Sequence, residues 1–187
     1  MKKFIDYTNI ISKLPPKTAE LLIRLQEGRF TKLNREAQRR LVSASKKECL
    51  NTIKLLKQDF TDSQADSIDV YCSSEYEKIN DGLRKGHISS EYKAVVDDLN
   101  DILNKNVLND DIVVYRGTRG VEKIDKAFKS VSINLYSAYN FSRTDDATIN
   151  AYLIPKDTKY IYVGGGEYEL ILPPMIDLER YKIFDNN

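Results

Sequence analysis

The sequence predicts an α+β fold in which amino-terminal helices are followed by a β core. Apolar residues recur at helical spacing up to about residue 105, with few strand signals between them. From residue 110 the pattern changes to short apolar runs separated by Gly, Pro, Asn and Asp. With 187 residues, of which 41% are hydrophobic, the chain is long and apolar enough for one compact domain with a sizeable core.

The first 60 residues are predicted to form two or three helices, and they are basic. Residues 1–60 hold 14 Lys and Arg against 6 Asp and Glu, whereas residues 61–187 hold 15 against 22. The net charge of +1 therefore conceals a basic helical region, 1–60, packed on an acidic core, 61–187. A basic helix face can contact phosphate or an acidic protein, or it can be merely solvated, and the composition leaves these alternatives open.

Two helical segments are predicted next, over residues 63–84 and 89–105. A serine, Ser73 or Ser74, can cap a new helix within the first segment, and another serine precedes the second. The apolar residues that recur at helical intervals in the first segment are Ile68, Tyr71, Tyr76, Ile79 and Leu83.

Short strands are predicted for the rest of the chain. Each apolar run is bounded by turn-forming residues, which indicates strands of ordinary length rather than helices. The six predicted strands cover residues 111–115, 128–133, 148–154, 159–163, 167–172 and 181–184.

The first predicted strand ends at an arginine. Residues 112–115 are uninterrupted apolar, as in a strand buried on both faces, and Arg116 and Gly117 follow directly. A guanidinium group at the mouth of a buried strand can bind a phosphate or carboxylate at two points. A structural ion pair with one of the many acids is the alternative.

The second predicted strand carries two serines. Side chains alternate across a strand, so Ser130 and Ser132 should lie on one face and Val131 on the other. A hydroxyl on that face could hold a catalytic carboxylate in position, or the two serines could simply form a polar surface.

Two glutamates open the fifth predicted strand, after a run of three glycines. Alternation should place Glu167 and Glu169 on one face, roughly 6 to 7 Å apart. Such a pair suits general base catalysis combined with stabilisation of a cation. It also suits a solvated sheet edge.

The sequence has few of the residues that other kinds of catalytic or metal site require. His87 is the single histidine, which disfavours Ser-His-Asp hydrolysis and His-rich zinc catalysis, and we expect no metal. Cys49 and Cys72 lie far apart and are expected to be free thiols. No apolar run reaches the roughly 18 residues needed for a membrane span, and polar residues interrupt the start of the chain. We therefore expect a protein of the cytoplasm, either of the producing cell or of a target cell if it is delivered.

Taken in order, these motifs resemble the R-S-E class of mono-ADP-ribosyltransferases. The arginine is Arg116, the S-x-S motif begins at Ser130, and the E-x-E motif ends at Glu169. Upstream, Y-x-x-x-x-Y-x-x-I-N-x-x-L-R at residues 71–84 is similar to the helix that covers NAD in this family. The resemblance spans residues 65–184 and includes the actin-modifying binary-toxin enzymes, their exoenzyme relatives and phage ADP-ribosyltransferases.

The resemblance implies a mixed, mostly antiparallel β core of the ADP-ribosyltransferase type with an NAD cleft, and NAD as co-substrate. It implies that Arg116 binds the NAD phosphates and that the Gly117 backbone approaches the nicotinamide. Ser130 would orient Glu169, which would stabilise the oxocarbenium-like cation as nicotinamide leaves. Glu167 would deprotonate or orient the acceptor. The remaining residues that the resemblance assigns to cofactor binding are Tyr71, Tyr76, Asn80, Arg84, Ser132, Phe141, which would pack on nicotinamide, and Arg143, a second phosphate contact.

The acceptor is less narrowly defined. In this family a glutamate at the position of Glu167 accompanies arginine acceptors, which implies a target protein modified by a toxin, effector or phage enzyme. An alternative is an intracellular enzyme that modifies RNA or DNA in a toxin-antitoxin or anti-phage system, which the basic region 1–60 favours. A non-catalytic or NAD-hydrolysing binding module is the third reading. A neutralising antitoxin or a delivery component would be further partners.

Overall fold

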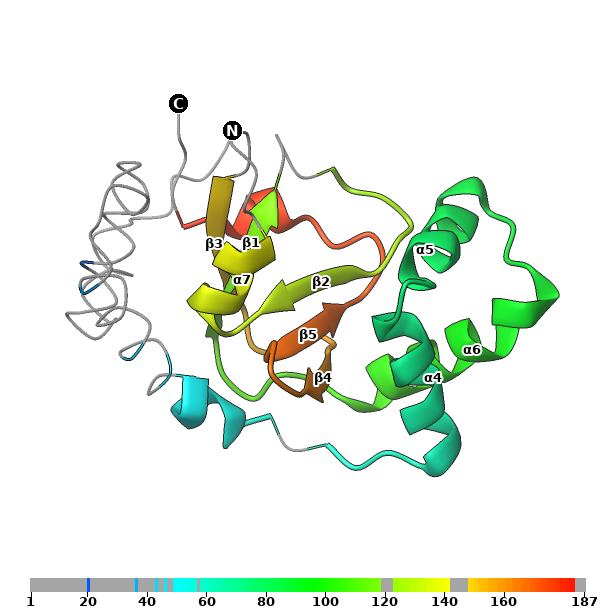
Figure 1. Ribbon diagram of the computed structural model, residues 1–187, viewed down its shortest axis with the longest axis horizontal. Helices are drawn as coiled ribbons and strands as arrows, with labels where there is room; N and C mark the ends of the chain where they lie inside the picture. Colours follow the sequence, from blue (N-terminus) through cyan, green and yellow to red (C-terminus); the bar gives the residue numbers. More distant parts are fainter. Residues whose placement is uncertain are drawn as a thin grey trace.

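The predicted α+β class is confirmed by a computed structural model, which describes residues 49–56, 58–118, 123–141 and 148–183 and the single positions 20, 36, 43 and 46. Helices come first and a five-stranded sheet follows (Figure 1). The elements are α4 (Asp62–Cys72), α5 (Tyr76–Lys85), α6 (Ser90–Lys105), β1 (Ile112–Thr118), β2 (Lys129–Ser132), α7 (Leu135–Phe141), β3 (Thr148–Ile154), β4 (Ile161–Gly164), β5 (Glu169–Leu172) and the 3-10 helix η1 (Leu178–Tyr181).

The sheet has the strand order β3-β1-β2-β5-β4, and each pairing between these strands is antiparallel. Strand β2 lies in the middle, with β1 on one side and β5 on the other. Ser132 of β2 stands opposite Tyr115 of β1 and opposite Glu169 of β5. This register brings the three predicted motifs onto adjacent central strands.

Apolar clusters cover the two faces of the sheet. Successive residues of β5 alternate between them, since Leu170 and Leu172 belong to one cluster and Ile171 to the other. The first cluster includes Cys49 and Leu56. The second is built largely from α4, α5 and α6, which lie to the right of β5 in Figure 1. The helices are thereby fixed against the sheet.

The expected alternation in β2 is confirmed. Ser130 and Ser132 pair with Ile171 and Glu169 of β5, while Val131 joins the first apolar cluster. Because partners in an antiparallel pair share a face, the two serines lie on the face that also carries Glu169.

Two expected elements differ in the structure. The predicted strand 181–184 is wrong, because residues 178–181 form η1 and Lys182 makes only an isolated bridge to Tyr152. The side chain of Asp177 accepts a hydrogen bond from the Arg180 amide, which stabilises the helical turn. The expected serine cap of α5 is also wrong: Glu75 is the N-cap residue and has no side-chain capping bond.

Cys49, Leu56 and Gln58 pack directly on the sheet. Residues 49–53 are helical, and Cys49 is fully buried. The amide side chain of Gln58 donates to the Tyr160 carbonyl at 3.1 Å and accepts from the Tyr162 amide at 2.8 Å. Gln58 therefore satisfies one backbone group of β4, the strand at the sheet edge, and one of the residue just before it. The proposed boundary at residue 60 stays a prediction, since most of region 1–60 lies outside the described residues.

None of the helices in the described ranges has both the length and the apolar character that crossing a membrane would demand.

Candidate active site

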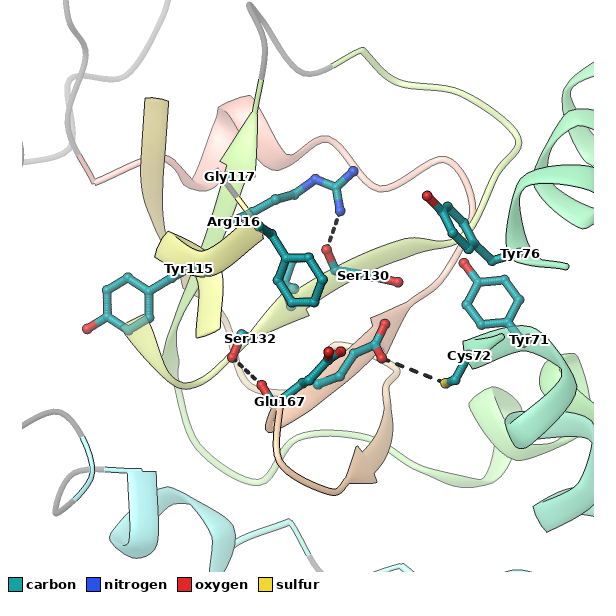
Figure 2. Close-up of a pocket in the computed structure, with 13 residues that line it drawn as sticks. Tyr71, Cys72, Tyr76, Tyr115, Arg116, Gly117, Ser130, Ser132 and Glu167 are labelled. Carbon is teal, nitrogen blue, oxygen red and sulfur yellow. Dashed lines mark hydrogen bonds between the residues drawn. The ribbon is translucent and has the colours of Figure 1, made fainter. Parts of the chain in front are cut away.

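A pocket of about 310 Å³ opens between α4, α7 and the central strands (Figure 2). Its size is that of a small-molecule site. It combines a guanidinium, two carboxylates, hydroxyls and several aromatic rings. The lining residues are Tyr71, Cys72, Tyr76, Tyr115, Arg116, Gly117, Ser130, Val131, Ser132, Ala138, Phe141, Glu167 and Glu169.

Glu169 is the first residue of β5 and is partly buried. Its carboxylate hydrogen-bonds to Ser130 of β2 and to the thiol of Cys72, whose Sγ lies 3.7 Å from Oε2. Burial raises the pKa of Glu169 above its usual value, and the nearby charge of Glu167 raises it further. The hydrogen bonds and the charge of Arg116 act in the opposite direction. Ser130 thus stands beside the carboxylate that it was expected to orient.

Glu167 lies in a turn and not on the strand, so the expected spacing on one strand face is wrong. The turn covers residues 165–168, and β5 begins only at Glu169. Gly164, Gly165 and Tyr168 have φ angles of 76°, 67° and 52°, which interrupt the two-residue alternation that the prediction assumed. Both carboxylates nevertheless line the same pocket.

The end of β2 fixes the backbone of this turn. The Ser132 hydroxyl donates to the carbonyl of Glu167 at 2.7 Å, marked in Figure 2, and the Ile133 amide donates to the carbonyl of Tyr168 at 3.1 Å. The main contribution of Ser132 to the pocket is therefore to fix the backbone of Glu167, which carries the second carboxylate.

Arg116 extends along the upper side of the pocket as drawn in Figure 2. Its guanidinium Nη1 donates to the carbonyl oxygen of Ser130. Gly117 follows it and leaves backbone exposed in the lining. A planar cation beside open backbone suits an anionic ligand with a flat head group.

Tyr71, in the last turn of α4, is almost fully buried and links the helices to the sheet. Its hydroxyl accepts a hydrogen bond from Asn80 Nδ2 at 3.1 Å and hydrogen-bonds to Ser130. Its ring meets Phe128 edge to face, with centroids 5.6 Å apart. Burial raises the pKa of Tyr71 to about 12, so its hydroxyl stays protonated at neutral pH. A row of interacting polar groups thus runs from Asn80 through Tyr71 and Ser130 to Glu169.

Two expected cofactor-binding residues are not part of the described pocket lining. Asn80 is buried behind Tyr71, where its Oδ1 also accepts from the Phe128 amide at 3.1 Å. Arg84 points elsewhere, because its Nε donates to Asp125 at 3.0 Å and its Nη1 to Asp81 at 3.3 Å. Arg143 lies outside the described residues.

Two exposed aromatic residues line the pocket from opposite elements. Tyr76 of α5 is 45% exposed and Phe141 of α7 is 66% exposed. Their ring faces are accessible in the pocket and can stack on a flat heterocycle.

Four lining residues were missed by the sequence reasoning: Cys72, Tyr115, Ala138 and Val131, which was expected to face the core. Tyr115 directly precedes Arg116, so the prediction of Arg116 as a site residue could have pointed to Tyr115 as well. Ala138 has no such signal, because α7 reaches the pocket only through its packing on β1 and β2. Cys72 follows Tyr71 in the sequence, but its approach to Glu169 depends on how α4 docks.

Comparison with known proteins identifies similar sequences. The model of the ADP-ribosyltransferase exoenzyme family matches residues 46–151. The NAD(+)–arginine ADP-ribosyltransferase EFV of Enterococcus faecalis is 31% identical over 116 residues, which cover 54% of this chain and 24% of that protein. The present chain thus spans about a quarter of the length of this relative.

Solved structures share the fold. The C3 exoenzyme of Clostridium limosum superposes with a TM-score of 0.58 at 14% identity, over 71% of this chain and 82% of that one. C3stau2 of Staphylococcus aureus, solved with NAD, gives a TM-score of 0.52 at 16% identity, over 72% and 84% of the two chains.

Replacing Asn80 with Ala should lower the free energy of unfolding by about 1 to 3 kcal/mol, because the buried Phe128 amide loses its acceptor. Asn100 is exposed on α6, so Asn100→Ala is a matched control that should change stability by less than about 0.5 kcal/mol. Urea denaturation of both variants measures this, and equal stabilities would contradict the structural role of Asn80.

Proposed function

Since this chain belongs to the ADP-ribosyltransferase exoenzyme family, we propose that it is an NAD-dependent mono-ADP-ribosyltransferase. It cleaves NAD at the bond between nicotinamide and ribose and transfers ADP-ribose to an arginine of a target protein. The observation that carries the proposal is the convergence of Arg116, Ser130 and Glu169 from three adjacent strands on one pocket, with Glu167 beside them.

The pocket suits the donor. Arg116 supplies a cation for the phosphates, and the backbone at Gly117 allows a flat amide to approach closely. The rings of Tyr76 and Phe141 offer faces for the nicotinamide. The presence of NAD in the C3stau2 structure supports the same donor in this fold. A further phosphate contact by Arg143 and the absence of a metal stay predictions.

Glu169 would promote the departure of nicotinamide. Positive charge develops on the ribose as this bond breaks, and a fixed carboxylate nearby stabilises that charge. The carboxylate must be ionised to act, although its raised pKa works against ionisation. The bond from Ser130 favours the ionised form and holds its orientation.

Glu167 would serve the acceptor. Its place in the turn next to β5 puts a second carboxylate where an incoming guanidinium can be bound and deprotonated. The surroundings are negative, since Glu169, Asp69 and Glu167 each raise the pKa of the Cys72 thiol. A negative field beside Glu167 attracts a cationic acceptor such as a guanidinium group. The activity in the name of the Enterococcus faecalis relative supports arginine.

The other readings have less support from the described residues. The basic residues that would favour RNA or DNA as acceptor fall almost wholly within the part of 1–60 that is not described. Modification of nucleic acid, a neutralising antitoxin, a delivery component and a cytoplasmic location stay predictions.

The proposal is tested with labelled NAD and whole-cell lysate. The wild-type protein should label material that protease destroys and nuclease does not. Glu169→Gln should lower both transfer and NAD hydrolysis by about a hundredfold or more, as loss of one preorganised charge commonly does. Asp66→Asn, at an exposed acid of α4, is the control and should behave as wild type. Nuclease-sensitive label would show a nucleic-acid acceptor, and undiminished turnover in Glu169→Gln would refute the mechanism.

Glu167→Gln should separate the two half-reactions. Transfer to arginine should be lost, whereas slow NAD hydrolysis should be largely retained, because Glu169 still supports nicotinamide departure. Transfer to agmatine and release of nicotinamide can be followed side by side. Equal loss of both activities would mean that Glu167 is not specific to the acceptor.

The pH dependence of NAD hydrolysis should report Glu169. Because the ionised carboxylate is required and its pKa is raised, kcat/KM should fall toward acid with a midpoint above the usual value of 4.5. Glu167→Gln removes a charge that raises this pKa, so the midpoint should move to lower pH. Ser130→Ala removes a hydrogen bond that lowers it, so the midpoint should move to higher pH. Shifts in the same direction would contradict the assignment.

A further inference from the structure

Cys72 reaches the same carboxylate from the helical side of the pocket. It is the last residue of α4, and its Sγ lies 3.7 Å from Oε2 of Glu169, the contact drawn as a dashed line at Cys72 in Figure 2. The two residues are 97 positions apart in the chain. Neither the motifs nor the proposed mechanism gives this thiol a role.

The position of Cys72 is fixed by its neighbours. Tyr71 anchors the last turn of α4 through Asn80 and Ser130. Helix α4 then ends at Ser73, whose amide and hydroxyl both donate to the Val70 carbonyl. These contacts fix the backbone of Cys72 beside Glu169, within reach of the carboxylate.

We propose that Cys72 is a positioning residue, whose S–H group donates to the Glu169 carboxylate and, together with Ser130, holds it in its catalytic orientation. This inference rests on the proposed function for its catalytic part. Ser130 approaches from β2 and Cys72 from α4, so two separate elements restrain one side chain. A carboxylate restrained from two sides loses less freedom when charge develops beside it.

The chemistry of the surroundings makes the thiol a donor and not a nucleophile. The side chain of Cys72 reaches solvent, but partial burial, followed by the charge of Glu169 and its hydrogen bond and by the charges of Asp69 and Glu167, raises the pKa of Cys72 to about 12. At neutral pH the sulfur is protonated, and only a protonated thiol can donate to a carboxylate. The charged or titratable groups around Glu169 are Glu167, Arg116, Tyr71 and Cys72.

The first test compares Cys72→Ala with Cys72→Ser in NAD hydrolysis. Cys72→Ala should lower kcat by about three- to tenfold, as expected for loss of one hydrogen bond, while KM for NAD changes little. Its acidic midpoint should move to higher pH, since the lost bond lowers the pKa of Glu169. Cys72→Ser restores a donor and should recover both properties. Ser74→Ala, at an exposed residue two positions on, is the control and should resemble wild type.

An unchanged kcat and pH profile in Cys72→Ala would overturn the proposal. A serine variant as impaired as the alanine variant, with the Ser74→Ala control intact, would also overturn it, because a donor would then not be what matters.

The second test measures the contact without any enzyme activity. Iodoacetamide should alkylate the native protein slowly at Cys72 and not at Cys49, which is fully buried and is the other thiol of the chain. Glu169→Gln removes the charge that suppresses the thiolate, so alkylation should become several-fold faster. Asp66→Asn should leave the rate unchanged. No acceleration in Glu169→Gln would overturn the contact, whereas absence of NAD hydrolysis in the wild type would refute only the proposed function.

Discussion

The antiparallel register of β2 between β1 and β5 is the constraint on which the pocket depends. Ser132 stands opposite both Tyr115 and Glu169, so the three central strands are locked relative to one another. If β2 slipped by one residue, the serine hydroxyls would face the first apolar cluster and the Val131 side chain would face away from it. The apolar residues on the far face therefore set the position of the polar ones. Packing on one face determines the chemistry on the other.

The helices then complete the site, because α4 presses its last turn against these strands. Tyr71 packs on Phe128 and joins Asn80 to Ser130, and the adjacent Cys72 meets Glu169. Burial by this layer raises the pKa of the carboxylate, while the hydrogen bonds that the layer supplies or supports partly offset the rise. The same packing thus disfavours the ionised form of Glu169 by burying it and favours that form by supplying hydrogen bonds.

The second carboxylate obeys a different constraint. Glu167 is placed by a turn whose backbone is held at Ser132 and Ile133, and not by the strand pairing that places Glu169. In the proposed reaction the donor is handled by groups on rigid strands and the acceptor by a group on a turn. Variation of acceptor specificity within such a fold is easier to accommodate there, since loops carry functional residues on a fixed scaffold.

The sequence by itself determined the order of helices and strands and the strand positions of Arg116, Ser130 and Glu169, because hydrophobic periodicity and strand alternation are local properties. It could not place Glu167, since the positive φ angle of Tyr168 breaks the alternation that the prediction used. Nor could it show that Asn80 lies behind Tyr71 rather than in the pocket, or that Cys72 touches Glu169. Those placements follow from how α4 and α5 dock on the sheet, which joins residues distant in the chain through packing that no local pattern encodes.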